Sequence, residues 1–141
     1  MEITYHDNTI LHVDKFSDIV NKSDVKFIKC SNMQLDSLSG IELCTSLREL
    51  NCSHNKLTSL QDIVLCTTLQ KLNLCCNLLT SLSGIESLTS LRKLHCGGNK
   101  QLKDVKGIES CLSLKKFGAP RKLYMQYLEL VINKKHNISH E

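Results

Sequence analysis

Residues 47–55 have the sequence LRELNCSHN, and two later stretches repeat the same pattern. Residues 69–77 have LQKLNLCCN and residues 91–99 have LRKLHCGGN, so the pattern recurs every 22 residues. Self-similarity at a period of about 20–50 residues is typical of proteins in which each repeat is one structural unit stacked on the next. The chain is therefore predicted to be a solenoid.

The alternation within each repeat predicts a short strand. If positions are counted from Leu47, Leu69 and Leu91, then positions 4 and 6 are apolar while positions 3, 5 and 7 are mostly polar. This period of two is that of a strand with one buried face. One such strand cannot bury its face alone, so neighbouring strands are expected to form a parallel ladder over a shared core.

An asparagine follows each predicted strand at position 9, as Asn55, Asn77 and Asn99. Its amide group can both donate and accept hydrogen bonds, so it is suited to backbone groups that the turn would otherwise bury without partners. The first repeat has Met33 at this position, so the asparagine ladder is expected to begin at Asn55.

The repeat register divides the chain into three parts. Residues 1–24 are predicted to be an N-terminal cap with a degenerate repeat, because residues 13–19 fit the second half of the pattern and the preceding residues fit it poorly. Four repeats follow, at residues 25–46, 47–68, 69–90 and 91–113. The last is one residue longer, which predicts a small bulge within residues 99–102. Residues 114–141 hold a last strand, a helix and a tail.

Residues 121–135 are predicted to form the helix. Pro120 precedes it, and apolar residues recur at helical spacing in Leu123, Tyr127 and Val131. The first interpretation is a cap over the last repeat, and the alternative is a helix that binds a partner. Residues 137–141 are predicted to be a disordered tail.

The eight cysteines follow the repeat register. Six of them stand at positions 6 and 20, where the remaining repeat has Leu74 and Leu88: Cys30, Cys52 and Cys96, then Cys44, Cys66 and Cys111. Free cysteine behaves as a small apolar residue, so these six are predicted to be buried thiols rather than disulfides or metal ligands. Such thiols indicate a reducing compartment, and the N-terminus shows no secretion signal. We expect a cytoplasmic or nuclear protein that is not secreted.

These repeats resemble the leucine-rich repeat family, in particular its short 22-residue class, which includes a regulatory subunit of protein phosphatase 1. The resemblance covers residues 13–117. It implies an α/β solenoid of right-handed curvature, with a parallel sheet on the concave face, short turns or 3₁₀ segments on the convex side and a C-terminal capping helix. Proteins of this family mostly bind other proteins, which is the function the resemblance implies here.

The register also predicts a basic concave face. Positions 2, 3 and 5 of the strands carry eight cations against one anion, Glu49, although the whole chain has a net charge of only +4. The candidate partner-binding residues are Lys26, Lys29, Arg48, Lys71, Arg92, Lys93, His95, Lys115 and Lys116. A surface of one sign attracts an oppositely charged partner and speeds its association. An exposed sheet that binds nothing and carries lysines for solubility is the alternative.

We therefore expect a non-catalytic module that binds an acidic protein surface, and a monomer when the chain is isolated. The alternative is a structural subunit of a large assembly, such as a virion or a ribonucleoprotein particle. No catalytic motif occurs, and no enzyme activity or cofactor is expected. Phe27 is the only aromatic residue of the predicted face, so binding of nucleic acid would be non-specific. No apolar run is long enough to span a membrane.

One cluster has the residue types of a metal site. His54 and Cys76 share a position in neighbouring repeats, with Cys75 beside them and His95 one repeat further on. Two thiols and two imidazoles can bind zinc. However, Cys75 and Cys76 are adjacent in a strand, where side chains diverge, and the chain has no C-x-x-C motif. Solvated side chains at the strand ends are the expected arrangement.

Overall fold

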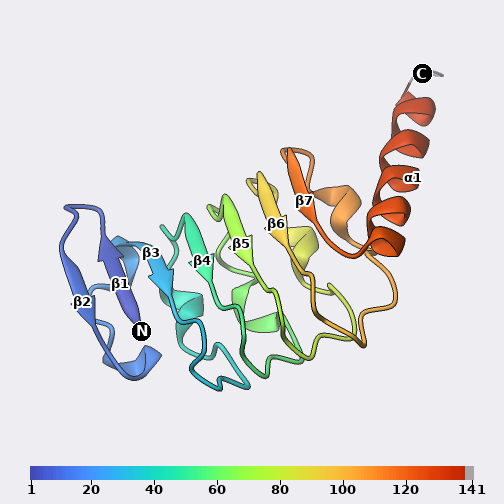
Figure 1. The fold of residues 1–141 in the computed structure, drawn as a ribbon. Helices are drawn as coiled ribbons and strands as arrows, with labels where there is room; N and C mark the ends of the chain where they lie inside the picture. Colours follow the sequence, from blue (N-terminus) through green and yellow to red (C-terminus); the bar gives the residue numbers. More distant parts are fainter. Residues whose placement is uncertain (139–141) are drawn as a thin grey trace.

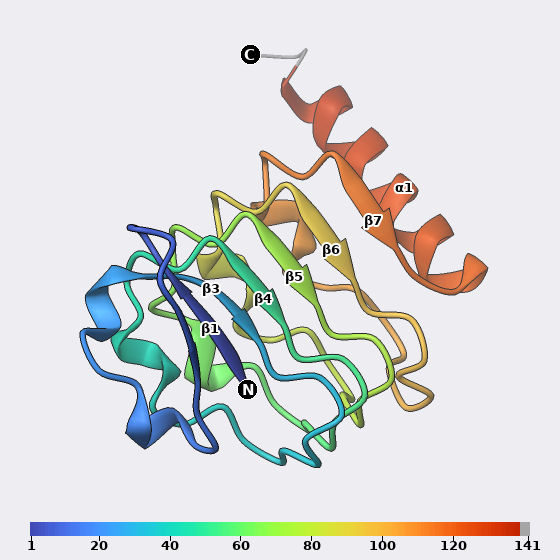
Figure 2. The same cartoon turned by 60° about the vertical axis from the view of Figure 1, so that its left-hand side comes forward.

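The computed structural model describes residues 1–138, which form a curved leucine-rich repeat solenoid (Figure 1). One sheet of seven strands runs its whole length, in the order β2-β1-β3-β4-β5-β6-β7. The strands are β1 (Glu2–Tyr5), β2 (Ile10–His12), β3 (Val25–Lys29), β4 (Glu49–Asn51), β5 (Lys71–Asn73), β6 (Lys93–His95) and β7 (Lys116–Gly118). Strands β3 to β7 are parallel and lie side by side (Figure 2).

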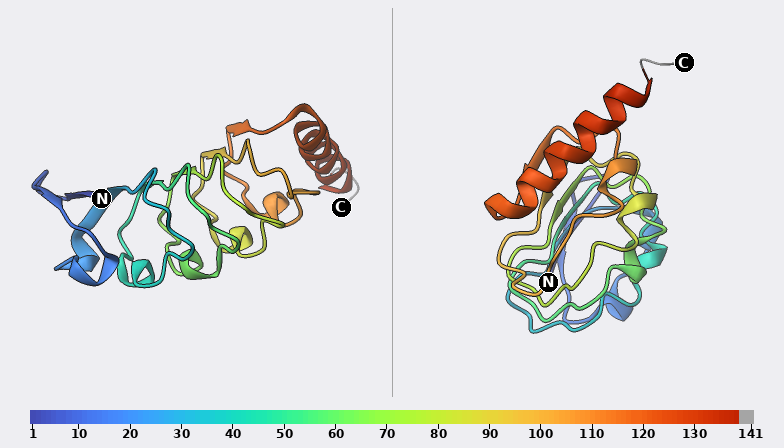
Figure 3. Two further views of the ribbon diagram at one scale, coloured as in Figure 1. Left: turned by 60° about the horizontal axis from the view of Figure 1, so that its bottom comes forward. Right: turned by 90° about the vertical axis from the view of Figure 1, so that its right-hand side faces the viewer.

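Short 3₁₀ segments form the opposite side of the solenoid (Figure 3). They are η1 (Phe16–Asp18), η2 (Lys22–Asp24), η3 (Ile41–Leu43), η4 (Gln61–Ile63), η5 (Ile85–Ser87) and η6 (Ile108–Ser110). Glycine precedes three of them, at Gly40, Gly84 and Gly107, with φ between 90° and 103°. This left-handed backbone favours glycine. The second repeat has Asp62 instead of glycine, and there the 3₁₀ segment begins at Gln61, two residues earlier in the repeat than the other three.

The core lies between the sheet and the 3₁₀ segments and is built from equivalent residues of successive repeats. Position 4 supplies Ile28, Leu50, Leu72 and Leu94, all of them buried. They are paired across the ladder, Ile28 with Leu50, Leu50 with Leu72 and Leu72 with Leu94, so equivalent positions of successive repeats lie side by side. The parallel ladder predicted from the alternation is therefore confirmed for β3 to β7.

The asparagine ladder runs along the turns that follow the strands. Asn55, Asn77 and Asn99 are buried, and each amide nitrogen donates to backbone carbonyls of its own repeat and of the preceding one. Each side-chain oxygen accepts a backbone N–H from the preceding repeat; Asn77 accepts that of Leu57 at 3.0 Å. The first member, Asn55, accepts the N–H of Met33, the residue that replaces asparagine in the first repeat.

The extra residue of the last repeat lies in a turn after β6. Leu102 donates its backbone N–H to the carbonyl of Asn99 at 3.0 Å, which closes a four-residue turn. Leu102 remains buried with 7% of its surface exposed. The insertion therefore leaves the core positions of this repeat in place.

The N-terminus differs from a degenerate repeat in its strand half. Strands β1 and β2 form an antiparallel hairpin, and β1 also pairs antiparallel with β3. The hairpin places Ile3 and Tyr5 in the core, while Phe16 and Ile19 cover the other side. An antiparallel hairpin closes the solenoid without needing a repeat, and this explains why residues 1–12 do not fit the pattern.

The helix α1 (Arg121–Ile138) follows β7 and lies across the end of the last repeat (Figure 3). Leu123 is buried, and Phe117 of β7 packs against Tyr124 and Tyr127 with ring centroids 6.3 and 5.0 Å apart. The helix ends three residues later than predicted, so residues 137 and 138 are helical rather than part of a tail. Residues 139–141, the rest of the predicted tail, lie outside the described residues.

All eight cysteines are free thiols, and the six at positions 6 and 20 are buried, as predicted for core residues. Burial raises the pKa of Cys30, Cys66 and Cys96 to about 12, so these thiols stay protonated at neutral pH. Cys76 is exposed and Cys75 is half-buried.

This difference predicts the order in which the thiols react. Because thiolate is the reactive form, a thiol reagent should modify Cys76 first in the folded protein and Cys75 more slowly, since burial raises the pKa of Cys75. The six core thiols should react only at the rate of unfolding. Mass spectrometry of protein labelled with and without denaturant measures this order. Rapid labelling of Cys52 or Cys66 in the folded state would contradict the burial of the ladder.

Candidate functional site: the concave surface

The concave face of the sheet is built by the strand residues whose side chains alternate with the core residues. Positions 3 and 5 of the repeat supply them, because positions 4 and 6 face inward. A hollow of about 450 Å³ lies on this face between β1 and β6. Among its lining residues are Glu2, Thr4, Phe27, Lys29, Glu49, Asn51, Lys71, Asn73, Cys75, Lys93 and His95.

Four of the nine residues predicted for partner binding line this hollow: Lys29, Lys71, Lys93 and His95. The cations at position 2 do not line it: Lys26 lies within β3, whereas Arg48, Arg92 and Lys115 stand just before β4, β6 and β7. Lys116 lies on β7, beyond the last strand that contributes to the hollow. The structure thus separates the predicted residues into a group that lines the hollow and a group that does not.

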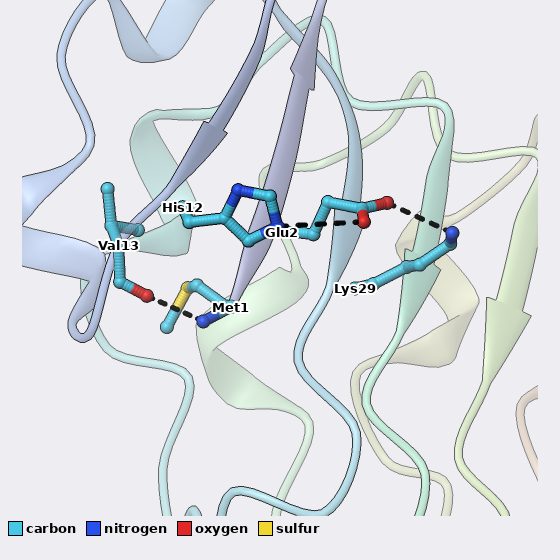
Figure 4. Close-up of polar contacts among 5 residues, drawn as sticks. All are labelled: Met1, Glu2, His12, Val13 and Lys29. Atoms are coloured by element: carbon cyan, nitrogen blue, oxygen red, sulfur yellow. Dashed lines mark hydrogen bonds and ion pairs between the residues drawn. The ribbon is translucent and has the colours of Figure 1, made fainter.

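Two acidic residues neutralise part of the basic face. Glu49 pairs with Lys71 on the next strand at 2.7 Å. Glu2 pairs with Lys29 at 2.9 Å, and its other oxygen lies 3.9 Å from His12 (Figure 4). The hydrogen bond from Lys29, with its charge, lowers the pKa of Glu2. These pairs therefore reduce the basic character of the hollow from β1 to β5.

Glu2 was not predicted as part of this face. The repeat register assigns strand positions only from residue 25 onward, whereas Glu2 reaches the face through the antiparallel pairing of β1 with β3, which places it opposite Lys29. The alternation of Glu2, Ile3, Thr4 and Tyr5 was the available signal, because it has the period of a strand.

The C-terminal half of the face keeps most of its positive charge. Lys71, Lys93 and Lys116 are directly in register on β5, β6 and β7. Arg92 and Lys115 precede Lys93 and Lys116 in the chain. Of these five residues, which we call the basic patch, only Lys71 has an ion pair with a carboxylate of residues 1–138. Like charges in register on neighbouring strands repel one another, so the patch destabilises the free protein slightly.

His95 lies beside the basic patch within the hollow. Burial lowers its pKa, and the charge of Lys93 lowers it further. Its ring also leans over Gly118 of β7, where a Cβ atom would come within 2.3 Å of Nδ1. The glycine therefore makes room for the imidazole, which is neutral at pH 7.

The lowered pKa of His95 predicts its titration. In an NMR titration its ring should titrate below the ordinary value of 6.5. Because the unfolded chain then binds a proton that the folded protein does not, stability should fall as pH decreases through 6.5. Lys93→Gln should raise the pKa of His95 part of the way, since burial remains. Lys26→Gln, a distant change of equal charge, should leave it unchanged, and a wild-type value at or above 6.5 would contradict this account.

The structure divides the four residues considered for metal binding. Cys75 and His95 line the hollow, whereas His54 and Cys76 do not, and both of these have a left-handed backbone with φ of 56° and exposed side chains. Within residues 1–138 no group of three or more histidine, cysteine or acidic side chains is arranged to hold a metal ion. Over the same residues, no helix is both long and apolar enough to cross a membrane.

Comparisons with known proteins agree with the fold. The model of a pair of leucine-rich repeats matches residues 67–110. Among curated proteins, none matches the chain in sequence. The repeating sheet and 3₁₀ segments, together with this match, give the chain the fold of a leucine-rich repeat solenoid.

Three solved structures from Listeria monocytogenes are similar to this chain. The internalin inlF has a TM-score of 0.65 at 24% identity, over 69% of this chain and 28% of its own. The functional domain of InlJ, described as including a cysteine ladder, has a TM-score of 0.62 at 28% identity, over 70% of this chain and 21% of its own. Internalin C2 has a TM-score of 0.63 at 21% identity, over 69% of this chain and 42% of its own. The chain thus matches less than half the length of each.

Proposed function

We propose that this protein is a non-catalytic interaction module that docks an acidic protein surface on its basic patch. The observation that carries the proposal is the alignment of Lys71, Lys93 and Lys116 on three neighbouring strands. Strand spacing in a sheet is about 4.8 Å, so three charges of one sign lie close together on a rigid support. Such an arrangement costs stability in the free protein and favours association with a surface of opposite charge.

The aromatic residues favour protein over nucleic acid as the partner. Phe27 is the one aromatic side chain lining the hollow among the described residues, and Lys26 lies over its ring, 4.9 Å from the centroid. The rings of Phe117, Tyr124 and Tyr127 pack against one another. No row of free rings is therefore available in residues 1–138 to stack successive bases.

The repeat class and the location are part of the same proposal. Pairing of Leu50 with Leu72 and of Leu72 with Leu94 supports the short 22-residue class, since successive strands are 22 residues apart. The free thiols support a reducing compartment such as the cytoplasm or nucleus.

The proposed binding should depend on salt. Exposed charges act at short range and are screened by salt, so affinity for the acidic partner should weaken as ionic strength rises.

A pull-down from the native source at low and moderate salt tests the proposal. The wild type is compared with Lys71→Glu/Arg92→Glu/Lys93→Glu, which reverses the centre of the patch. A matched control reverses three exposed lysines elsewhere, Lys56→Glu/Lys100→Glu/Lys103→Glu, with the same change in net charge. Circular dichroism checks that both variants fold.

The proposal expects a partner that the wild type and the control retain at low salt and the patch variant loses. Equal retention by all three proteins would show that the patch does not bind the partner. If instead the protein were recovered only together with intact particles, and the patch variant behaved like the wild type, a structural subunit of a large assembly would be favoured.

A further inference from the structure

The two ends of the solenoid are closed in different ways. At the C-terminal end, α1 covers the last repeat, and Phe117 of β7 packs against its tyrosines. At the N-terminal end, β2 is the outermost strand of the sheet over residues 1–138. Exposed edge strands are usually protected by lysine, proline or a covering element, because their free backbone groups pair readily with another strand. The three residues of β2 (Ile10, Leu11 and His12) include neither lysine nor proline, and all three are exposed.

The hydrogen bonds of the hairpin determine which backbone groups of β2 are free. Tyr5 donates its N–H to the carbonyl of Thr9, and Val13 donates to that of Met1 (Figure 4 shows the other bond of this pair, from the N-terminal amine to Val13). In an antiparallel ladder, residues alternate in the side to which their backbone groups point. The backbone N–H and C=O groups of Leu11 therefore point toward β1, whereas those of Ile10 and His12 point away from the sheet.

The side chains of β2 are also placed by its pairing. Leu11 lies opposite Ile3, on the core side of the sheet, and His12 lies opposite Glu2, on the concave side. Leu11 is 38% exposed and borders a second hollow of about 300 Å³, together with Tyr5 and Val20. Val20 is 58% exposed, so an apolar surface without a cover lies next to the open edge.

We propose that β2 of a second copy of this chain occupies this edge, in an antiparallel arrangement with a twofold axis at Leu11. Ile10 of one copy then faces His12 of the other, and these are the two residues with outward backbone groups. Each copy donates two N–H groups and accepts two, so every free group of the edge has a partner. Leu11 faces Leu11 of the second copy in the non-hydrogen-bonded pair, where side chains approach most closely.

Charge complementarity supports a second copy as the occupant. The same axis brings the hairpin turn of one copy, which carries Asp7, toward the segment after β2 of the other, which carries Lys15. Asp7 accepts the backbone N–H of Thr9 at 2.8 Å, and this bond lowers the pKa of Asp7, so it is charged at neutral pH. The arrangement joins two seven-stranded sheets into one continuous sheet. Because the paired strands are short, the dimer should be weak and dependent on concentration.

Cross-linking tests the proposed axis. Cα atoms of a non-hydrogen-bonded pair lie about 4.5 Å apart, which suits a disulfide. In a Cys76→Ser background, which removes the exposed native thiol, Leu11→Cys should give a cross-linked dimer on mild oxidation. Ile10→Cys is the matched control, since the two copies of residue 10 are diagonal neighbours at about 7–8 Å or more and should cross-link poorly.

Sedimentation of the unmodified protein gives the second measurement. The mass of the wild type should rise toward that of a dimer with concentration, whereas Leu11→Lys should remain monomeric, with an unchanged circular dichroism spectrum. The proposal is overturned if the wild type stays monomeric and Leu11→Cys does not cross-link, which is the state expected from the sequence alone. Equal cross-linking of Ile10→Cys and Leu11→Cys would refute the twofold axis at Leu11. None of these outcomes depends on the basic patch, so they are separate from the test of partner binding.

Discussion

Replacing Asn77 by alanine is expected to lower the free energy of unfolding by about 2–3 kcal/mol, because one buried backbone N–H loses its partner and two carbonyls each lose one of their two side-chain donors. Asn77 is only 3% exposed, and its amide nitrogen donates to the carbonyls of Cys52 and Leu74. Its oxygen accepts the backbone N–H of Leu57, which is buried in the neighbouring repeat. The carbonyls of Cys52 and Leu74 each keep a second asparagine donor, whereas the buried N–H of Leu57 loses its partner and bears the desolvation cost of an unmade bond.

Asn73→Ala is the control, since Asn73 has the same side chain four residues earlier. It is half-buried on the concave face, and its oxygen accepts the N–H of Cys75 at 3.0 Å. Because solvent can reach that site, we expect Asn73→Ala to lower the free energy of unfolding by less than about 1 kcal/mol. Equilibrium denaturation by urea, followed by circular dichroism, measures both. If Asn77→Ala cost no more than Asn73→Ala, the ladder would not be the element that joins the repeats.

The size of this effect follows from how the ladder is shared. The carbonyl of Cys52 accepts from both Asn55 and Asn77, and that of Leu74 accepts from both Asn77 and Asn99. Each asparagine therefore contacts two repeats, and its loss weakens the interface between them rather than one turn. In a solenoid, where each repeat contacts only its neighbours, such interfaces carry much of the stability.

The repeating part of the fold was predictable because each residue type is determined by its position. Leucine, cysteine and asparagine at fixed positions predict the strand, the core and the ladder without knowledge of distant contacts. The N-terminal hairpin was not predictable in this way, since it closes the solenoid by pairing β1 with β3 in the opposite direction. That pairing depends on tertiary contacts of Ile3 and Tyr5, for which the repeat offers no equivalent position.

The charge of the concave face shows the same limit. The register identifies the cations that share a face, but it does not show that Glu2 arrives from another element and pairs with Lys29. Nor does it separate the residues inside the hollow, such as Lys93, from those before the strands, such as Arg92. Only the three-dimensional arrangement shows that the charge is uneven and that most of the unpaired cations lie in the C-terminal half of the face.

Lys93→Glu is expected to change affinity and stability in opposite directions. Lys93 is in register between Lys71 and Lys116, so a glutamate there replaces two repulsions by two attractions. Cross-strand pairs of this kind contribute roughly 0.2–1 kcal/mol, and we expect the variant to be more stable than the wild type by about 0.5 kcal/mol. At the same time it reverses the centre of the basic patch, and affinity for an acidic probe should fall by about 100-fold at low salt, since like charges across an interface cost several kcal/mol.

Two measurements on the same samples test whether affinity and stability change in opposite directions. Urea denaturation gives stability, and fluorescence anisotropy with a labelled poly-glutamate peptide gives affinity at several salt concentrations. Lys93→Gln should lie between wild type and Lys93→Glu in both, because it removes the charge without reversing it. Lys103→Glu, an exposed change away from the patch, should alter neither strongly. A loss of affinity together with a loss of stability would indicate damage to the fold, whereas unchanged affinity with higher stability would show that the aligned lysines repel one another without binding acidic groups.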